Sequence, residues 1–208
     1  HPVIRGNKTI ITKWFRQASL GIANKEELNK HIKTFTKKGF KKSNLDNKLF
    51  KKLNSFYKEK KDKFTDEYVA GGFIQSDISE VPSSLLDLTD DLRQDIHSSL
   101  KKPLEEWSQS NLEPTFVYGI RDYKEGAVLV PHRDRENTHI ISAIINISKD
   151  VDEDWPLVIE DHFYRKHEIF LDPGEVIFYE SARLLHGRPY PLNGKSFANI
   201  FCHYRPID

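Results

Sequence analysis

A change of sequence pattern at about Pro114 is the feature that most constrains the fold of this chain. From there to the C-terminus, short runs rich in β-branched and aromatic residues are separated by Gly, Pro, Asp and Asn, with no helical periodicity between them. Closely spaced short strands without intervening helices predict an antiparallel sandwich or jelly roll. The predicted strands cover residues 115–123, 127–132, 139–147, 157–160, 167–171, 175–179 and 197–204.

The first half of the chain shows helical periodicity, from about Asn24 to Trp107. One helix is predicted over 24–39, and a second follows over about 45–57. The lysine-rich face of this second helix suits solvent better than an acidic partner. A third helical stretch begins near Ser83, and Pro103 is expected to kink or split it. We therefore predict a single domain over 1–208, in which 1–113 is a mostly helical support and 114–208 is the β core.

Charge and composition exclude several classes of function. Lys and Arg number 32 and Asp and Glu 31, and the β half has no dense basic, aromatic-lined stretch, so we expect no nucleic-acid partner. No apolar run is long enough for a membrane span, and the single Cys202 cannot form an internal disulfide. We expect a soluble protein and favour the cytoplasm. The first residue, His1, is not an initiator Met, which leaves room for a removed leader. The sequence does not indicate an oligomeric state.

A set of candidate metal ligands lies within the β half. His132 and Asp134 end a predicted strand, and residues separated by one in an extended chain point to the same side. His186 follows the predicted strand 175–179. Two imidazoles and one carboxylate occupy one face of an octahedral ferrous ion and leave the other face open, whereas structural zinc usually takes four ligands. Each histidine alone can equally be an ordinary surface or loop residue, so the prediction rests on the combination.

Lys195 is a candidate for neutralising a buried anion. It follows His186 by nine residues, at the start of the last predicted strand. A carboxylate that reaches the interior of a β barrel needs a cation, because an unpaired buried charge is costly. The alternative is an exposed turn lysine, since Asn193 and Gly194 precede it.

At these residues the sequence resembles the 2-oxoglutarate- and iron(II)-dependent dioxygenases, and within them the prolyl 4-hydroxylase-like family. The likeness runs over about 117–206. Tyr123-x-x-Gly126 followed by Pro131-His132-x-Asp134 is similar to the first metal motif of the family. The final segment, Lys195-x-x-Ala198-Asn199-x-Phe201-x-His203, is similar to the last strand of collagen-type prolyl hydroxylases.

The resemblance implies a double-stranded β-helix core with iron(II), 2-oxoglutarate and molecular oxygen as cofactor and co-substrates, and ascorbate as a reductant. It implies hydroxylation of a C–H bond, with peptidyl proline as the first candidate, and release of succinate and carbon dioxide. The partner would be a peptide or protein substrate rich in proline. Hydroxylation of lysine, a free amino acid or another small molecule stays open, as does a non-catalytic metal-binding jelly roll.

The resemblance also implies roles around the co-substrate. Lys195 would pair with the distal carboxylate of 2-oxoglutarate, with Tyr123 or Asn146 adding a hydrogen bond. Asn146 stands where the family often has a tyrosine, and Trp155-Pro156 replaces paired glycines, which puts the substrate-side loop in doubt. His203 either contacts the metal-side carboxylate of 2-oxoglutarate or is an ordinary core histidine.

Four further residues are candidates for substrate contact. Arg133 and Arg188 lie beside the proposed ligands in sequence and are expected near the mouth of the site, with a surface salt bridge as the alternative for each. Trp155 and Tyr179 offer flat surfaces that can pack on a proline ring, although aromatic packing in the core is more common.

Overall fold

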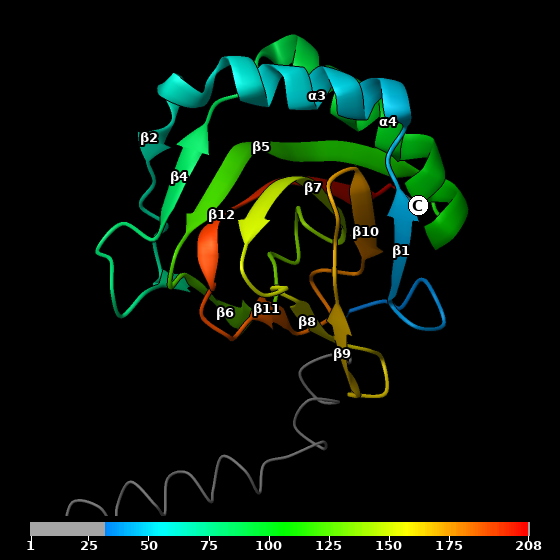
Figure 1. Cartoon of the computed structure of the whole chain (residues 1–208). Coiled ribbons are helices and arrows are strands. Elements are labelled where there is room, and N and C mark those ends of the chain that lie inside the picture. The colour runs from blue at the N-terminus through cyan, green and yellow to red at the C-terminus, as the bar shows by residue number, and fades with distance from the viewer. Residues whose placement is uncertain (1–31, 208) are drawn as a thin grey trace, which may run out of the picture. The chain divides into compact units, whose positions relative to one another are not determined.

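The computed structural model describes residues 32–207, and the chain from Thr34 onward forms one compact unit (Figure 1). Most of the helix predicted over 24–39 lies outside the described residues, and the described residues 32–39 are not helical. No helix in the part of the chain that the structure describes is long and apolar enough to cross a membrane.

Fifteen helical and strand segments follow one another along the described chain. In sequence order they are β1 (Phe40–Asn44), α3 (Asn47–Glu59), a 3-10 turn η1 (Lys61–Lys63), β2 (Thr65–Asp66), β3 (Ile74–Gln75), β4 (Ser83–Leu86), α4 (Asp90–Ser108), β5 (Leu112–Lys124), β6 (Val128–His132), β7 (Ile141–Val151), β8 (Leu157–Glu160), β9 (Lys166–Ile169), β10 (Glu175–Tyr179), β11 (His186–Arg188) and β12 (Gly194–Pro206).

Two antiparallel sheets form the core, as a double-stranded β-helix requires (Figure 1). The larger sheet has seven strands in the order β1-β10-β7-β12-β5-β4-β2, and the smaller has five in the order β3-β6-β11-β8-β9. Apolar side chains contributed by both sheets, such as Leu157, Ile177 and Phe197, form one buried cluster. The predicted jelly-roll class is therefore confirmed, and each strand predicted after Pro114 is present with small shifts of its ends.

Helices α3 and α4 cover the outer face of the larger sheet (Figure 1). The side chain of Asp46 caps α3 by accepting from the Leu49 N–H, and Thr89 caps α4 by accepting from the Leu92 N–H. Apolar residues at helical spacing, among them Leu53 and Ile96 at 0% exposure, form a second buried cluster with the sheet. This packing fixes the larger sheet from behind and leaves its inner face to the site.

The structure differs from the prediction for the N-terminal half in three respects. The third helix does not begin near Ser83, because 83–86 form strand β4, which pairs with β5, and the helix begins only after the Thr89 cap. Pro103 lies inside α4 rather than dividing it into two helices. Four strands, β1 to β4, lie in the region expected to be mostly helical. Three of them pair with strands far away in sequence, and local periodicity does not report such pairing.

Candidate functional site

The structure brings together the three predicted metal ligands. His132 ends β6, Asp134 follows in the next loop, and His186 begins β11 directly opposite His132 in the antiparallel ladder. One ligand atom from each residue lies within 4.8 Å of the others. The Asp134 Oδ1 atom is 3.5 Å from His132 Nε2 and 3.8 Å from His186 Nε2. The three groups therefore converge on one point, as the sequence spacing predicted.

Backbone contacts orient both imidazoles for ligation. The Nδ1–H of His132 donates to the Val130 carbonyl at 2.7 Å, and the Nδ1–H of His186 donates to the Leu184 carbonyl at 2.9 Å. A carbonyl only accepts, so Nδ1 carries the proton and the Nε2 lone pair faces Asp134. This is the arrangement that orients metal-binding histidines in proteins.

The electrostatic environment differs among the three residues. Burial would lower the pKa of His132, but contacts with Asp134 and the Val130 carbonyl raise it. Burial lowers the pKa of His186 to about 4, which favours the neutral imidazole that binds metals. Burial alone would raise the pKa of Asp134, but its interactions with the neighbouring imidazoles of His132, His186 and His203 hold that pKa below its usual range. The Oδ2 atom of Asp134 is buried and has no hydrogen-bond partner among the described residues. An ionised carboxylate with a free buried oxygen suits a cation.

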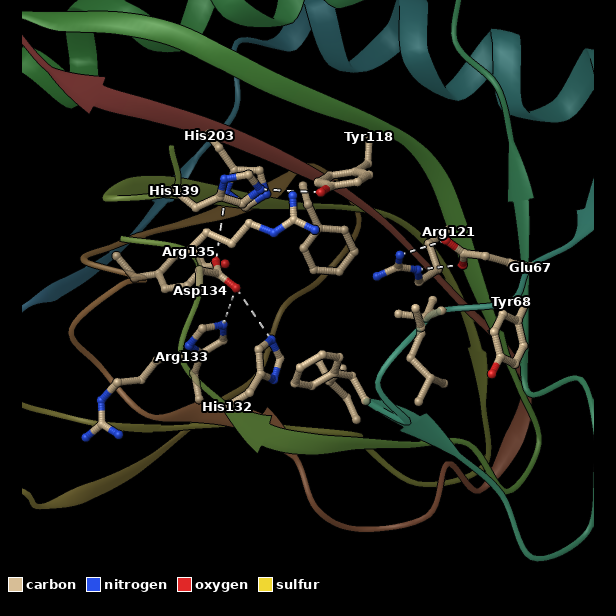
Figure 2. A pocket seen from close by; sticks show the side chains of 18 residues that line it. Glu67, Tyr68, Tyr118, Arg121, His132, Arg133, Asp134, Arg135, His139 and His203 are labelled. Atoms are coloured by element: carbon tan, nitrogen blue, oxygen red, sulfur yellow. Dashed lines mark hydrogen bonds and ion pairs between the residues drawn. The ribbon is translucent and has the colours of Figure 1, made fainter. Parts of the chain in front are cut away.

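A pocket of about 370 Å³ opens onto these ligands (Figure 2). Its wall combines apolar and aromatic side chains with charged ones from both sheets and from the segment between β2 and β3. The ring of Tyr179 lies edge-on to His186, with 4.8 Å between ring centroids, and Phe73 lies 5.1 Å from the His132 ring. The candidate ligands therefore form part of the wall of an open, largely aromatic cavity.

A second group of polar side chains borders Asp134, and only His203 of this group was predicted from the sequence. The rings of His139 and His203 stack at 3.8 Å, and Tyr118 places its hydroxyl 3.4 Å from His139 Nε2 (Figure 2). His203 Nδ1 lies 2.6 Å from the Ser142 hydroxyl and 3.9 Å from Asp134 Oδ2. Burial lowers the pKa of His203 to about 3, so this histidine is neutral.

A buried ion pair forms another part of the wall. Arg121 of β5 donates to both carboxylate oxygens of Glu67, at 2.6 and 2.7 Å, and its guanidinium lies 5.1 Å from the Phe201 ring (Figure 2). The Ser83 hydroxyl also donates to Glu67, at 3.1 Å. Neither partner could be found from the sequence, because the two are 54 positions apart and share no motif. The pair satisfies the charge of Arg121 within the protein.

The structure corrects the position of Lys195. Its side chain is 85% exposed and lies 3.6 Å from Asp150 on the surface. In the pairing with β7, Gly194 faces Val151 and Ser196 faces Asp150, so Lys195 is the extra residue of a β-bulge. A bulge breaks the alternation that would otherwise direct this side chain inward. Lys195 is thus an exposed lysine, which was the alternative interpretation of its sequence.

Arg188 lies elsewhere than predicted, whereas Trp155 takes the core position that was the more common alternative for it. Both are buried, at 1% and 3% exposure, in the interior rather than at the mouth of the site. The Trp155 indole N–H donates to the Tyr190 carbonyl at 2.6 Å, and its ring packs on Tyr123. Trp155 is therefore a core residue and offers no surface to a substrate.

The remaining predicted residues divide between the pocket and the interior. Arg133 and Tyr179 line the pocket, and Arg133 donates to the Arg183 carbonyl at 2.8 Å. Tyr123 and Asn146 are fully buried behind the pocket, and each keeps one side-chain oxygen without a hydrogen-bond partner in the described region. These two oxygens therefore keep hydrogen-bonding capacity that the described residues do not use.

Comparison with known proteins identifies the fold. No family model and no curated protein matches the sequence, but solved structures do. The α-ketoglutarate-dependent epimerase SnoN from nogalamycin biosynthesis matches with a TM-score of 0.63 and 11% identity, over 88% of this chain and 84% of that chain. HygX from Streptomyces hygroscopicus, solved with nickel, 2-oxoglutarate and hygromycin B, matches with a TM-score of 0.59 and 14% identity, over 82% and 84%.

A prolyl hydroxylase from Trichoplax adhaerens, in complex with a peptide fragment of the hypoxia inducible factor, matches with a TM-score of 0.56 and 12% identity, over 92% of both chains. The chain therefore has the jelly-roll fold of the 2-oxoglutarate-dependent oxygenases, and prolyl hydroxylases are among the proteins that share it.

Proposed function

We propose that this chain is an iron(II)- and 2-oxoglutarate-dependent oxygenase that hydroxylates a C–H bond and converts 2-oxoglutarate to succinate and carbon dioxide. The observation that carries the proposal is the pair of imidazoles whose Nδ1–H groups bind backbone carbonyls while both Nε2 atoms face Asp134. Two neutral nitrogens and one carboxylate are the ligand set of non-haem iron oxygenases. His132, Asp134 and His186 would hold the iron, which when bound supplies oxygen activation.

The protein side chains around this set would bind, orient and exclude water. Tyr179 and Phe73 pack on the two ligand imidazoles and limit their rotation. His139 and His203, both with pKa values lowered by burial, present neutral polar edges beside Asp134 and add no competing charge. Such a partly apolar wall protects a reactive centre from bulk water.

Peptidyl proline is the first candidate substrate, and a small molecule is the second. The prolyl hydroxylase that shares the fold holds a peptide, which supports the first. HygX, whose structure contains hygromycin B, supports the second. Burial of Trp155 removes one aromatic surface that a proline ring would use, while the exposed Tyr68 at the pocket provides another. Peptidyl lysine and free amino acids are further candidate substrates.

The test is formation of succinate from 2-oxoglutarate by the purified protein with iron(II), oxygen and ascorbate. Candidate substrates are then screened by mass spectrometry for a gain of one oxygen: proline-rich and lysine-containing peptides, free amino acids and glycosides. Substrate-stimulated succinate that is lost in Asp134→Ala is the expected result. Binding of metal and 2-oxoglutarate without succinate under any condition would instead make the chain a non-catalytic binding module.

A further inference from the structure

Arg188 lies on the inner side of the smaller sheet, one alternation step from a proposed metal ligand. It ends β11, two residues after His186, so the two side chains leave the strand on the same side. Two residues of extended strand span about 7 Å, which is the order of length of a five-carbon diacid. The register partner of Arg188 on β6 is Leu129, which lines the pocket.

The guanidinium of Arg188 is buried, and residues 32–207 place no carboxylate in an ion pair with it. One amino group donates to the Trp155 carbonyl, and the other has no partner in the described part of the chain. The guanidinium lies 4.4 Å from the ring centroid of Phe197 and 4.7 Å from that of Trp155. Cation–π contacts of this kind offset only part of the cost of burying the charge. Burial accordingly lowers the pKa of Arg188 to about 10.

Tyr123 supplies a second free polar group at the same place. Its ring packs edge-on against Trp155, with 5.1 Å between ring centroids, and Trp155 in turn lies 4.7 Å from the Arg188 guanidinium. The Arg121 guanidinium lies 6.0 Å from the Tyr123 ring. The Tyr123 hydroxyl is buried and has no hydrogen-bond partner among the described residues. A guanidinium N–H and a phenol O–H, both unpaired and both inside an aromatic enclosure, are donors that a carboxylate accepts from.

Lys195 and Arg121 do not meet this requirement. Lys195 is 85% exposed at the bulge of β12. Arg121 lines the pocket, but its guanidinium already makes two hydrogen bonds to Glu67. Arg188 alone of these three combines full burial with an unused donor.

We propose that Arg188, with the Tyr123 hydroxyl, binds the distal carboxylate of the 2-oxo diacid whose other end lies at His132, Asp134 and His186. The cation thus comes from β11, on the strand that carries a metal ligand, and not from Lys195 on β12. This proposal rests on the proposed function, because it takes a 2-oxo diacid as the co-substrate. It predicts selectivity for a diacid over a 2-oxo monoacid.

The experiment measures binding, without turnover, to the cobalt(II)-loaded protein by quenching of tryptophan fluorescence. The probes are 2-oxoglutarate and 2-oxobutyrate, which keeps the 2-oxo acid end and lacks the distal carboxylate. In Arg188→Met we expect the dissociation constant for 2-oxoglutarate to rise on the order of 100-fold while that for 2-oxobutyrate stays unchanged. Lys195→Ala is the control and should bind both probes like the wild type.

Tyr123→Phe removes only a hydroxyl and covers the case in which Arg188→Met does not fold. It should weaken 2-oxoglutarate about tenfold and leave 2-oxobutyrate unaffected. Wild-type affinity for 2-oxoglutarate in a folded Arg188→Met or in Tyr123→Phe, or a selective loss in Lys195→Ala, overturns the assignment of Arg188. Failure of the wild type to bind either probe with cobalt(II) overturns the proposed function instead.

Discussion

Replacing Asp134 by Asn should remove the stabilisation that a divalent metal gives to this protein. Asp134 Oδ1 lies within 3.8 Å of both ligand imidazoles, and the amide of Asn keeps the shape of the side chain but loses its charge. At a metal concentration of 100 times the dissociation constant, binding adds about 2.7 kcal/mol to the free energy of unfolding. For a domain of this size, that corresponds to a rise in Tm of about 5–10 °C.

The variant should lose nearly all of this shift. If loss of the carboxylate weakens metal binding about 100-fold, the same metal concentration equals the new dissociation constant. Binding then contributes only RT ln 2, about 0.4 kcal/mol, or roughly 1 °C. The assay is thermal unfolding with and without cobalt(II), for the wild type and Asp134→Asn side by side.

Asp161→Asn is the matched control. The Asp161 carboxylate is also buried and also faces a histidine, accepting from His167 at 2.9 Å and from Arg165 at 2.8 Å, but it does not line the pocket. This variant should unfold at a lower temperature than the wild type and still show the full metal shift. A full shift in Asp134→Asn, or its loss in Asp161→Asn, would refute the ligand assignment.

Three further perturbations follow from the structure. Burial raises the pKa of Asp122 to about 6, so the folded state binds this proton more tightly than the unfolded chain and stability falls as pH rises from about 4 through 6. Asp122→Asn should remove that loss of stability, which is at most about 3 kcal/mol at pH 8 and absent at pH 4. Equal effects of the substitution on thermal unfolding at the two pH values would contradict this. A Cβ on Gly187 would lie 2.7 Å from the Leu129 carbonyl oxygen. Gly187→Ala should therefore destabilise the fold by about 1–3 kcal/mol and reduce the rise in Tm that cobalt(II) causes. An unchanged rise would show that β6 and β11 need not pack this closely. Arg121→Gln should lower the free energy of unfolding in denaturant by about 3–5 kcal/mol, because it leaves Glu67 buried without its ion-pair partner. Adding Glu67→Gln to the same chain should recover part of that loss. Strictly additive losses would show that the two side chains do not interact.

The candidate metal ligands could be predicted from the sequence because most of their geometry is local. His132 and Asp134 are two positions apart at the end of a strand, where alternation alone directs both side chains to one side. His186 required only that a later strand return beside β6, which any jelly roll of these strands achieves. The pattern of short strands and turns was thus sufficient to predict that these three side chains converge.

The cation that we propose for the co-substrate could not be predicted in the same way. The position of Lys195 depends on one extra residue in the pairing of β12 with β7, and a single bulge exchanges inside for outside. Arg188 lies in a strand of three residues, which is too short for periodicity to report. Similarly, Glu67 and Arg121 meet through tertiary packing alone.

The location of Arg188 has a mechanical consequence for the proposed site. Strand β11 is paired on both sides, with β6 and β8, and Gly187 allows the β6 backbone to approach closely. The register shift between His186 and Arg188 places the extra residue on β6, so β11 itself keeps its alternation. A strand clamped in this way fixes the distance from His186 to the guanidinium more firmly than the bulged, solvent-exposed start of β12 could for Lys195. The same three residues would then set both ends of the co-substrate, which explains why the surface position of Lys195 need not disable the site.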